Sequence, residues 1–570
     1  MFMVVKHKYI FGVMFAIMLL AAFLRLWDIG GPDIASDDAL YSFRAVGYLD
    51  YVAAINRQST PVTWFEEEAW WQKLSFHDAP PLVFAAQWLF FQTGGESVFV
   101  ARLPFVIAGL LSVFFIFILG RYTANVFVGI AAALSLAIMN YALWISKIGL
   151  LDGFLVLWII LSLYFFLRAR DKPAHYLWWG VFFGLGVLTK YTFLFMGPVF
   201  LTALILWQRE AFKKKWFYGG ILGILLLITP LIIYNVQMWQ TRGHLDAALS
   251  TLIGQKPDDF KSLTRETSTD FNITAPLIEI AGNNVSAGVQ LLFLVSFLVL
   301  LRASFRNEGT VVYQWILLLG FLWAVIMLSV VGAHNRFGVA LIPFIVLIIA
   351  QGGVLLWGYM RTLWGKRLFM ALALIVLIWE GVFTFQSQLL ITPFVDHGLF
   401  VAENRPRRDG YSQLESYVSD FYKKFPEPFY FLTFSGTPQL EQLQREYLEP
   451  RIAQAPDAPQ QKQLLVFDDR MEWFPTMWTF ERRFLYTSLP ILSLGAFLEN
   501  VRVRGAEFYT QLGLYDVVFI MTTPQTRQNE EVNNKILQSF GETLEANNKL
   551  IGYILGPRGE TAFTVYRTSL

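Results

Sequence analysis

Runs of about 20 mostly apolar residues recur along the first two thirds of the chain, and this repetition constrains the fold more than any other feature. A helix needs about 20 such residues to cross a bilayer. Charged residues make up only 15% of the 570 residues, against about 25% in a typical soluble domain. The sequence therefore predicts a polytopic α-helical membrane protein.

About eleven segments have the length and apolarity of a span. They are residues 9–27, 103–120, 124–145, 153–168, 175–192, 194–208, 217–237, 287–301, 311–331, 337–358 and 367–388. The apolar segment 80–92 is shorter, so we expect a re-entrant or interfacial helix there. The N-terminus has no small-x-small cleavage site after its apolar run, so we interpret it as an uncleaved first helix.

Basic residues orient these spans. If the N-terminus is cytoplasmic, every predicted inner loop carries Lys or Arg, as cytoplasmic loops tend to do. These residues are Arg121, Arg168, Arg170, Lys172, Lys213, Lys214, Lys215, Arg302, Arg306, Arg361, Lys366 and Arg367. We therefore expect a multi-pass protein of the inner (plasma) membrane, with residues 28–101 as a long first outer loop that contains interfacial helices.

The composition changes near residue 395, which divides the chain into a membrane domain, 1–394, and a soluble extracytoplasmic domain, 395–570. In the tail, the segments 429–434, 463–469, 516–521 and 562–566 have the pattern of strands, and PQLEQLQREYLE has that of an amphipathic helix. This alternation predicts a small α/β domain. It has no Gly-rich phosphate loop, so we assign it no catalytic role.

Several kinds of chemistry are excluded by composition. The chain has no cysteine, which rules out disulfides, thiol nucleophiles and cysteine metal sites. Its formal net charge of +2 gives no electrostatic reason to expect nucleic acid as a partner. Motifs of zinc peptidases, nucleophile-elbow hydrolases and P-loop enzymes are missing from the sequence.

Three carboxylates are predicted to meet the outer face. Asp37 and Asp38 follow a Gly-Pro turn in the first outer loop, and Asp152 lies in the short outer loop after the third span. An aspartate before a helix can simply cap it. Capping explains one aspartate better than two, and acids that converge from separate loops more often mark a site. We therefore treat all three as candidate catalytic residues.

Basic residues also lie on this face, against the positive-inside pattern. They are Lys73, Arg102, Lys147, Lys190, Arg242 and Arg336, and His244 lies in the outer loop after the seventh span. Each alone could be a side chain that snorkels to lipid headgroups. Together they would suit a phosphate or diphosphate group at the membrane interface. His77 and Asp78 with Asp37 could hold a divalent cation, although their spacing is not diagnostic of a metal.

Nucleotide donors are scarce outside the cytoplasm, so an activated sugar is best delivered there on a lipid phosphate. A carboxylate near the sugar could take a proton from an acceptor hydroxyl on a glycan, lipid or protein. Basic residues could stabilise the departing lipid phosphate. A transporter or flippase of lipid-linked or anionic substrates is the alternative, but transporters tend to show repeats and midplane charges. A simple membrane anchor would need one span only.

These motifs resemble the GT-C family of polyprenyl-phosphate-dependent glycosyltransferases, in particular protein O-mannosyltransferases and lipid A aminoarabinose transferases. The resemblance covers roughly residues 9–360 and rests on six elements in order. They are Asp37-Asp38, HDAPPL, ARLPFVIAGLLSVFFIFILGRY, SKIGLLDGF, GLGVLTKY and AHNRFGVALIP. Each is weak alone, and their order at the predicted outer and inner ends makes the resemblance specific.

The resemblance implies a role for each acid. Asp37 matches the catalytic base, Asp38 its acidic neighbour, and Asp152 a second acid that positions the acceptor or an ion. Lys147 matches a basic residue five positions before that acid, and the family inverts the anomeric configuration in one displacement. Two departures limit the match. Ala79 stands where a basic residue often precedes the prolines, which shifts phosphate binding to Lys73, His77 or Arg336, and the tail after 395 has no counterpart.

Overall fold

The computed structural model describes residues 7–51, 61, 64–65, 69–260, 274–307, 310–332, 335–395, 398–423, 463–487, 489–505, 507–524, 526, 535–547 and 549–570. The chain forms two compact units. The first, the membrane unit, comprises Met1–Gly30 and Trp70–Pro406; the second, the tail unit, comprises Gly31–Ala69 and Arg407–Leu570. The division predicted at residue 395 was based on the change of composition along the sequence. The tail unit also includes residues 31–69, which belong to the first predicted outer loop.

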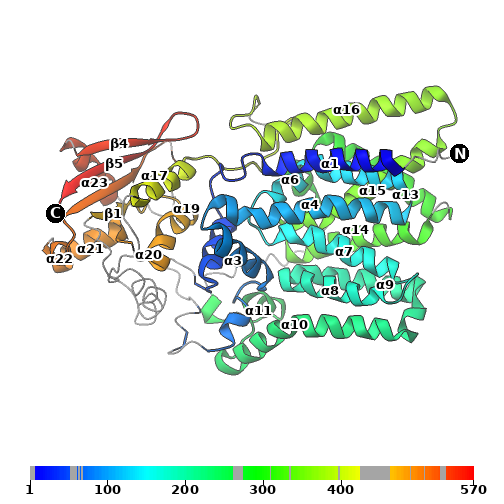
Figure 1. The fold of residues 1–570 in the computed structure, drawn as a ribbon, viewed down its shortest axis with the longest axis horizontal. Coiled ribbons are helices and arrows are strands. Elements are labelled where there is room, and N and C mark those ends of the chain that lie inside the picture. The colour runs from blue at the N-terminus through cyan, green and yellow to red at the C-terminus, as the bar shows by residue number, and fades with distance from the viewer. Residues whose placement is uncertain are drawn as a thin grey trace. The chain divides into compact units, whose positions relative to one another are not determined.

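The membrane unit is a bundle of long apolar helices (Figure 1). Among the described residues, seven helices are long and apolar enough to cross a membrane. They are α1 (His7–Leu26), α4 (Val98–Thr123), α10 (Lys215–Arg242), α13 (Ala287–Phe305), α14 (Val311–Val331), α15 (Ile342–Tyr359) with its preceding turn η6 (Phe337–Leu341), and α16 (Leu363–Gln388). This confirms the polytopic helical fold.

Shorter helices complete the unit. They are α3 (Leu82–Gly94), α5 (Val126–Ile138), α6 (Asn140–Ser146), α7 (Asp152–Arg168), α8 (His175–Thr189), α9 (Met196–Trp207), α11 (Ala247–Leu252), α12 (Thr274–Asn284) and the turns η2 (Gln72–Leu74), η3 (Tyr191–Phe195), η4 (Arg209–Lys213) and η5 (Asp258–Phe260). The count of about eleven spans is not confirmed, because α7, α8 and α9 are short and α5 and α6 form a pair bent by 63°.

The bend between α5 and α6 exposes backbone groups that the bilayer cannot hydrogen-bond. Side chains from other helices satisfy them. Arg25 of α1 donates to two carbonyls in the last turn of α5, each at 3.1 Å, and Thr384 Oγ1 of α16 donates to the last carbonyl of α5 at 2.8 Å. Glu380 Oε1 of α16 accepts from the N–H of Asn140, the first residue of α6, at 2.8 Å. The bend is therefore stabilised by specific polar partners.

Close helix packing in the membrane unit depends on glycine. Helices α8 and α10 pack together along their length. A Cβ atom on Gly180 of α8 would lie 2.1 Å from the carbonyl oxygen of Gly220 of α10, and one on Gly220 would lie 2.3 Å from that of Tyr176. Small residues allow such close approach of backbones between membrane helices.

The tail unit contains a five-stranded mixed sheet with strand order β2-β1-β3-β5-β4 (Figure 1). Its strands are β1 (Gln463–Phe467), β2 (Ile491–Ser493), β3 (Asp516–Thr522), β4 (Leu550–Leu555) and β5 (Thr561–Ser569). Strand β1 pairs in parallel with β2 and β3, whereas β5 is antiparallel to β3 and β4. This confirms the predicted small α/β domain.

Helices cover both faces of this sheet. They are α17 (Tyr411–Lys423), α19 (Trp473–Thr476), the π-helix η7 (Met477–Glu481), α20 (Arg482–Thr487), α21 (Leu494–Arg504), α22 (Glu507–Gln511) and α23 (Lys535–Ala546), and the first loop contributes α2 (Asp37–Gly47) to the unit. One core packs α17 and η7 against the sheet, and the other packs α21, α22 and α23.

The predicted strands at 463–469, 516–521 and 562–566 correspond to β1, β3 and β5. The short strand β2 and the edge strand β4 were not predicted. The predicted strand at 429–434 and the helix PQLEQLQREYLE lie outside the described residues.

We expect Gly220→Ala to lower the thermal unfolding midpoint of the purified protein, because the added methyl group meets the backbone of α8. The matched control is Gly223→Ala on the same helix, where a Cβ meets nothing within 4 Å. This control should be neutral or slightly stabilising, since alanine is favoured over glycine inside helices. Equal midpoints for the two variants would contradict the packing argument.

A second prediction concerns pH. Burial raises the pKa of Glu481 from its ordinary value of 4.5 to about 8. Between these two pH values Glu481 is protonated in the folded protein but ionised in the unfolded chain. The free energy of unfolding is therefore highest below about pH 4.5 and falls as the pH rises through about 8. Glu481→Gln should remove this dependence and unfold at a higher temperature than the wild type at alkaline pH. The control is Glu499→Gln, which changes an exposed glutamate. Unfolding temperatures of wild type and Glu481→Gln that change with pH in parallel would contradict this prediction, as would an equal effect of Glu499→Gln.

Candidate active site

The two adjacent aspartates begin α2 in the tail unit. Asp37 is half-buried and accepts a hydrogen bond from Tyr41 Oη at 3.2 Å, whereas Asp38 is buried. Ser36 precedes them with φ 56° and ψ −150°. Residues other than glycine adopt this conformation only at a cost, and such strain is concentrated at functional sites. The strained residue therefore marks the start of α2 as a candidate site.

The third acid, Asp152, begins α7 in the membrane unit and pairs with a lysine. Lys190, at the end of α8, places its Nζ 2.7 Å from Asp152 Oδ1 and 2.8 Å from Oδ2. Asp152 is 2% exposed and the Lys190 side chain is 15% exposed. A buried pair of this kind is sensitive to the loss of either partner, because the remaining charge would be left without compensation. The sequence predicted both residues but not that they pair.

A second cation joins this pair through an aromatic ring. Lys190 Nζ lies 4.3 Å from the ring centroid of Phe337, and the guanidinium of Arg336 lies 5.2 Å from it. Both distances are within the range of cation–π attraction. The structure thus brings Asp152, Lys190 and Arg336 together around Phe337, which sequence reasoning did not identify.

Arg242 and His244 share one carboxylate that was also not predicted. Arg242 donates to both oxygens of Asp259 at 2.6–2.9 Å, and His244 Nε2 lies 2.9 Å from Asp259 Oδ2. Burial alone would raise the pKa of Asp259, but the hydrogen bonds from Arg242 and His244 lower it below its ordinary value. These three residues help to line an open groove of about 420 Å³.

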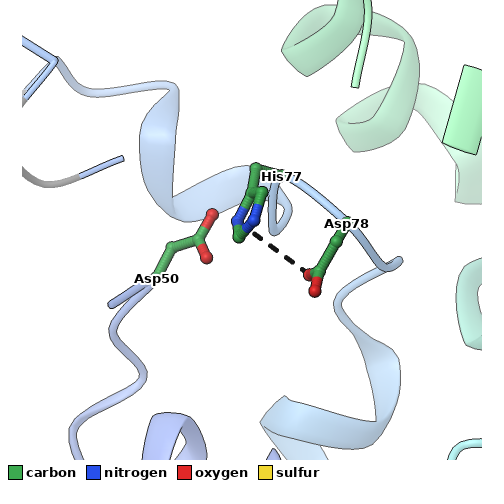
Figure 2. A group of neighbouring side chains, drawn as sticks. All are labelled: Asp50, His77 and Asp78. Carbon is green, nitrogen blue, oxygen red and sulfur yellow. Dashed lines mark ion pairs between the residues drawn. The ribbon is translucent and has the colours of Figure 1, made fainter. Parts of the chain in front are cut away.

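The two candidate histidines meet at Phe260. The ring of His77 stacks on Phe260 with centroids 5.8 Å apart, and that of His244 meets it edge-on at 4.8 Å. His77 is fully buried, and its Nδ1 lies 3.9 Å from Asp78 Oδ1. A dashed line marks this ion pair in Figure 2. Asp50, which Figure 2 also labels, belongs to the tail unit. The predicted cation at His77, Asp78 and Asp37 stays a prediction.

The buried carboxylate of Asp246 connects the residues next to Lys190 with those around the two histidines. Asp246 caps α11 by accepting from the N–H of Leu249 at 2.8 Å, and it also accepts from Tyr191 Oη and from Asn235 Nδ2. Burial raises the pKa of Asp246. Tyr191 follows Lys190 directly, and Ala247 donates its N–H to the carbonyl of His77 at 2.8 Å. The signal in the sequence was an aspartate before a short helical segment, two residues after His244.

The other three predicted cations have different surroundings. Lys147 Nζ donates to the carbonyls of Trp27 at 2.8 Å and Gln388 at 3.3 Å. Arg102 Nη1 donates to the carbonyl of Ile29 at 3.0 Å. Lys73 lies exposed in η2. The contacts of Lys147 and Arg102 join chain segments, so in this structure part of their hydrogen-bonding capacity serves the fold.

The membrane unit therefore gathers acids, cations and imidazoles from separate helices and loops. They are His77, Asp78, Asp152, Lys190, Asp246 and Arg336, with Arg242, His244 and Asp259 linked through Phe260. Carboxylates can hold or move protons, and guanidinium and ammonium groups can bind a phosphate. Asp37 and Asp38 belong to the tail unit.

Comparisons with known proteins show what the chain is similar to in sequence and fold. Residues 78–234 match the family described as dolichyl-phosphate-mannose-protein mannosyltransferase. No curated relative matches the sequence. Among solved structures, the chain is similar to ArnT from Cupriavidus metallidurans in the apo state, with TM-score 0.54, 12% identity and 98% of each chain covered.

Two further structures resemble the chain. ArnT from the same organism bound to undecaprenyl phosphate gives a TM-score of 0.50 at 11% identity, with 99% of this chain and 98% of that chain covered. The oligosaccharyltransferase of Archaeoglobus fulgidus gives 0.48 at 13% identity, with 90% and 70% covered. The family match and the fold shared with ArnT confirm the resemblance to the GT-C glycosyltransferases predicted from the sequence motifs.

Proposed function

We propose that this protein transfers a sugar from a polyprenyl-phosphate-linked donor to an acceptor hydroxyl on the extracytoplasmic side of the membrane. One observation carries the proposal. The family match covers Asp152 and Lys190, and the structure pairs these two residues beside Arg336. The undecaprenyl phosphate bound to ArnT supports a donor of this chemical class, since the two chains share a fold.

In the proposed reaction, the oxygen of the acceptor hydroxyl attacks the anomeric carbon of the donor sugar. Asp37 takes the proton from that hydroxyl at the same time. The bond between that carbon and the phosphate oxygen breaks, and its electron pair leaves with the polyprenyl phosphate. One displacement inverts the anomeric configuration. Asp38 supports the base, and Asp152 positions the acceptor.

Cationic groups would stabilise the negative charge that grows on the leaving phosphate. Lys190 and Arg336 both lie beside the ring of Phe337, and Lys190 also pairs with Asp152. Arg336 is the cation that we assign to the phosphate, because its guanidinium lies beside Phe337 and the Asp152–Lys190 pair. Arg242 and His244 are held by Asp259, so we assign them to the outer groove rather than to the reacting phosphate.

The positive-inside pattern supports a cytoplasmic N-terminus and an extracytoplasmic tail in the inner (plasma) membrane. A lipid donor suits that side, because its phosphate lies at the interface while its sugar extends outward. The acceptor on a glycan, lipid or protein is set by the shape of the pocket.

We expect Asp37→Asn to lower turnover by roughly 10²–10⁴-fold, the usual contribution of a positioned base. The measurement is the release of polyprenyl phosphate from labelled lipid-linked pentose, hexose and aminosugar donors. Asp516→Asn, a surface aspartate paired with Arg567, is the matched control and should retain full turnover. Full turnover by Asp37→Asn would refute the base assignment. Movement of donor across liposomes without its cleavage would favour a transporter.

A separate prediction tests the buried pair. Asp152→Asn leaves the Lys190 ammonium without its partner, and breaking a buried pair costs about 3–5 kcal/mol. We expect a lower unfolding midpoint and lower turnover, and partial recovery of the midpoint in the Asp152→Asn, Lys190→Met double variant. Asp171→Asn, an exposed acid of the same unit, is the control. Additive effects of the two substitutions on the midpoint would argue against coupling.

A further inference from the structure

The segment that carries Asp37 and Asp38 is packed into the same compact unit as the C-terminal domain. Residues 31–69 group with residues 407–570, although about 340 residues of membrane helices separate them in the sequence. Nearly all of α2 is buried, from Asp38 to Val46. The helix is therefore a buried part of the same unit as the tail.

Asp33 fixes the entry to α2. It is 4% exposed, and its N–H donates to the carbonyl of Arg407 at 2.8 Å. Its carboxylate accepts from the N–H of Ser412 at 2.7 Å and from the N–H of Asp409. Ser412 lies in the first turn of α17, where backbone N–H groups have no partner within the helix, and Asp409 lies just before that helix. Asp33 thus caps a helix of the C-terminal domain from a distant part of the chain.

A second attachment holds the body of α2. Tyr486 Oη, from α20, donates to the carbonyl of Phe43 at 3.0 Å. The ring centroids of Phe43 and Tyr486 lie 5.6 Å apart. Both side chains are buried. Helix α2 also packs against α19 and η7. The C-terminal domain therefore contacts α2 itself as well as the residues before it.

Ser36 lies between these two attachments, three residues after Asp33 and directly before Asp37. Its strained backbone persists only if the surrounding structure determines it on both sides. The capping contacts of Asp33 hold one side, and the packing of α2 holds the other. The direction in which the first turn of α2 presents its carboxylates is then set by the tail.

We propose that the C-terminal domain is a positioning element of the catalytic site, with Asp33 and Tyr486 as positioning residues for Asp37 and Asp38. This inference rests on the proposed function, in which Asp37 is the base. A base acts only within hydrogen-bond reach of the proton that it removes. A displacement of about 1 Å can cost roughly 100-fold in rate. The domain thus acts on the chemical step rather than on donor binding.

The test compares Asp33→Asn and Tyr486→Phe with a matched control in the full-length protein. Asp33→Asn keeps the shape of the side chain but replaces one accepting oxygen by a donor, and Tyr486→Phe removes one hydroxyl. The control is Asp420→Asn, an exposed aspartate of α17 paired with Lys423. Turnover is measured as release of polyprenyl phosphate, and donor binding is measured separately with polyprenyl phosphate itself.

We expect Asp33→Asn to lower kcat by roughly tenfold or more, and Tyr486→Phe by roughly threefold to tenfold. Affinity for polyprenyl phosphate should stay near the wild-type value in both, and Asp420→Asn should be unchanged. Because a merely structural role would weaken binding and kcat together, the split between them identifies positioning. If Asp33→Asn fails to fold, Tyr486→Phe alone decides the question.

Two outcomes overturn the inference. One is a wild-type kcat for the folded variants while Asp37→Asn is inactive, which would leave the proposed function intact. The other is a parallel loss of kcat and polyprenyl phosphate binding. Full turnover by Asp37→Asn would instead refute the proposed function itself, so the two failures are distinguishable.

Discussion

The satisfaction of backbone polar groups at the bend between α5 and α6 is the constraint on which the membrane unit depends. A bilayer offers no water to these groups, so a broken helix requires partners from its neighbours. Arg25, Thr384 and Glu380 supply them. Because α6 leads into the loop that ends at Asp152, this bend also determines where the chain can place that acid.

The same polar cluster extends to a predicted site residue. Gln388 Nε2 donates to Asn140 Oδ1 at 2.9 Å, and the backbone carbonyl of Gln388 accepts from Lys147. Lys147 therefore interacts with the C-terminal end of α16, where a positive charge is favourable. Glu380 was detectable in the sequence as the acid of an apolar run, since ionisable residues inside spans are rare and have a function. Its partner Asn140 was not, because helix bends leave no simple periodic signal.

The partners of the predicted cations are decided by the fold. The sequence placed Lys190, Arg242, His244 and Arg336 on one face, but only the fold assigns Asp152 to Lys190 and Asp259 to Arg242 and His244. The first pair is 38 residues apart, so neither spacing nor helix periodicity could predict it. A buried charge is costly without its partner, so each of these pairs depends on the packing that brings its two residues together.

The sequence by itself determined the class of the protein. Apolar runs, basic loops and six motifs in order predicted a helical membrane fold resembling the GT-C glycosyltransferases, with an α/β tail, because these features depend on local composition and span length. Tertiary structure decided how the predicted residues combine. It paired the acids with particular cations, and it joined Asp33 and α2 to the C-terminal domain. Those contacts link residues far apart in the chain, and their geometry follows from packing that no local pattern encodes.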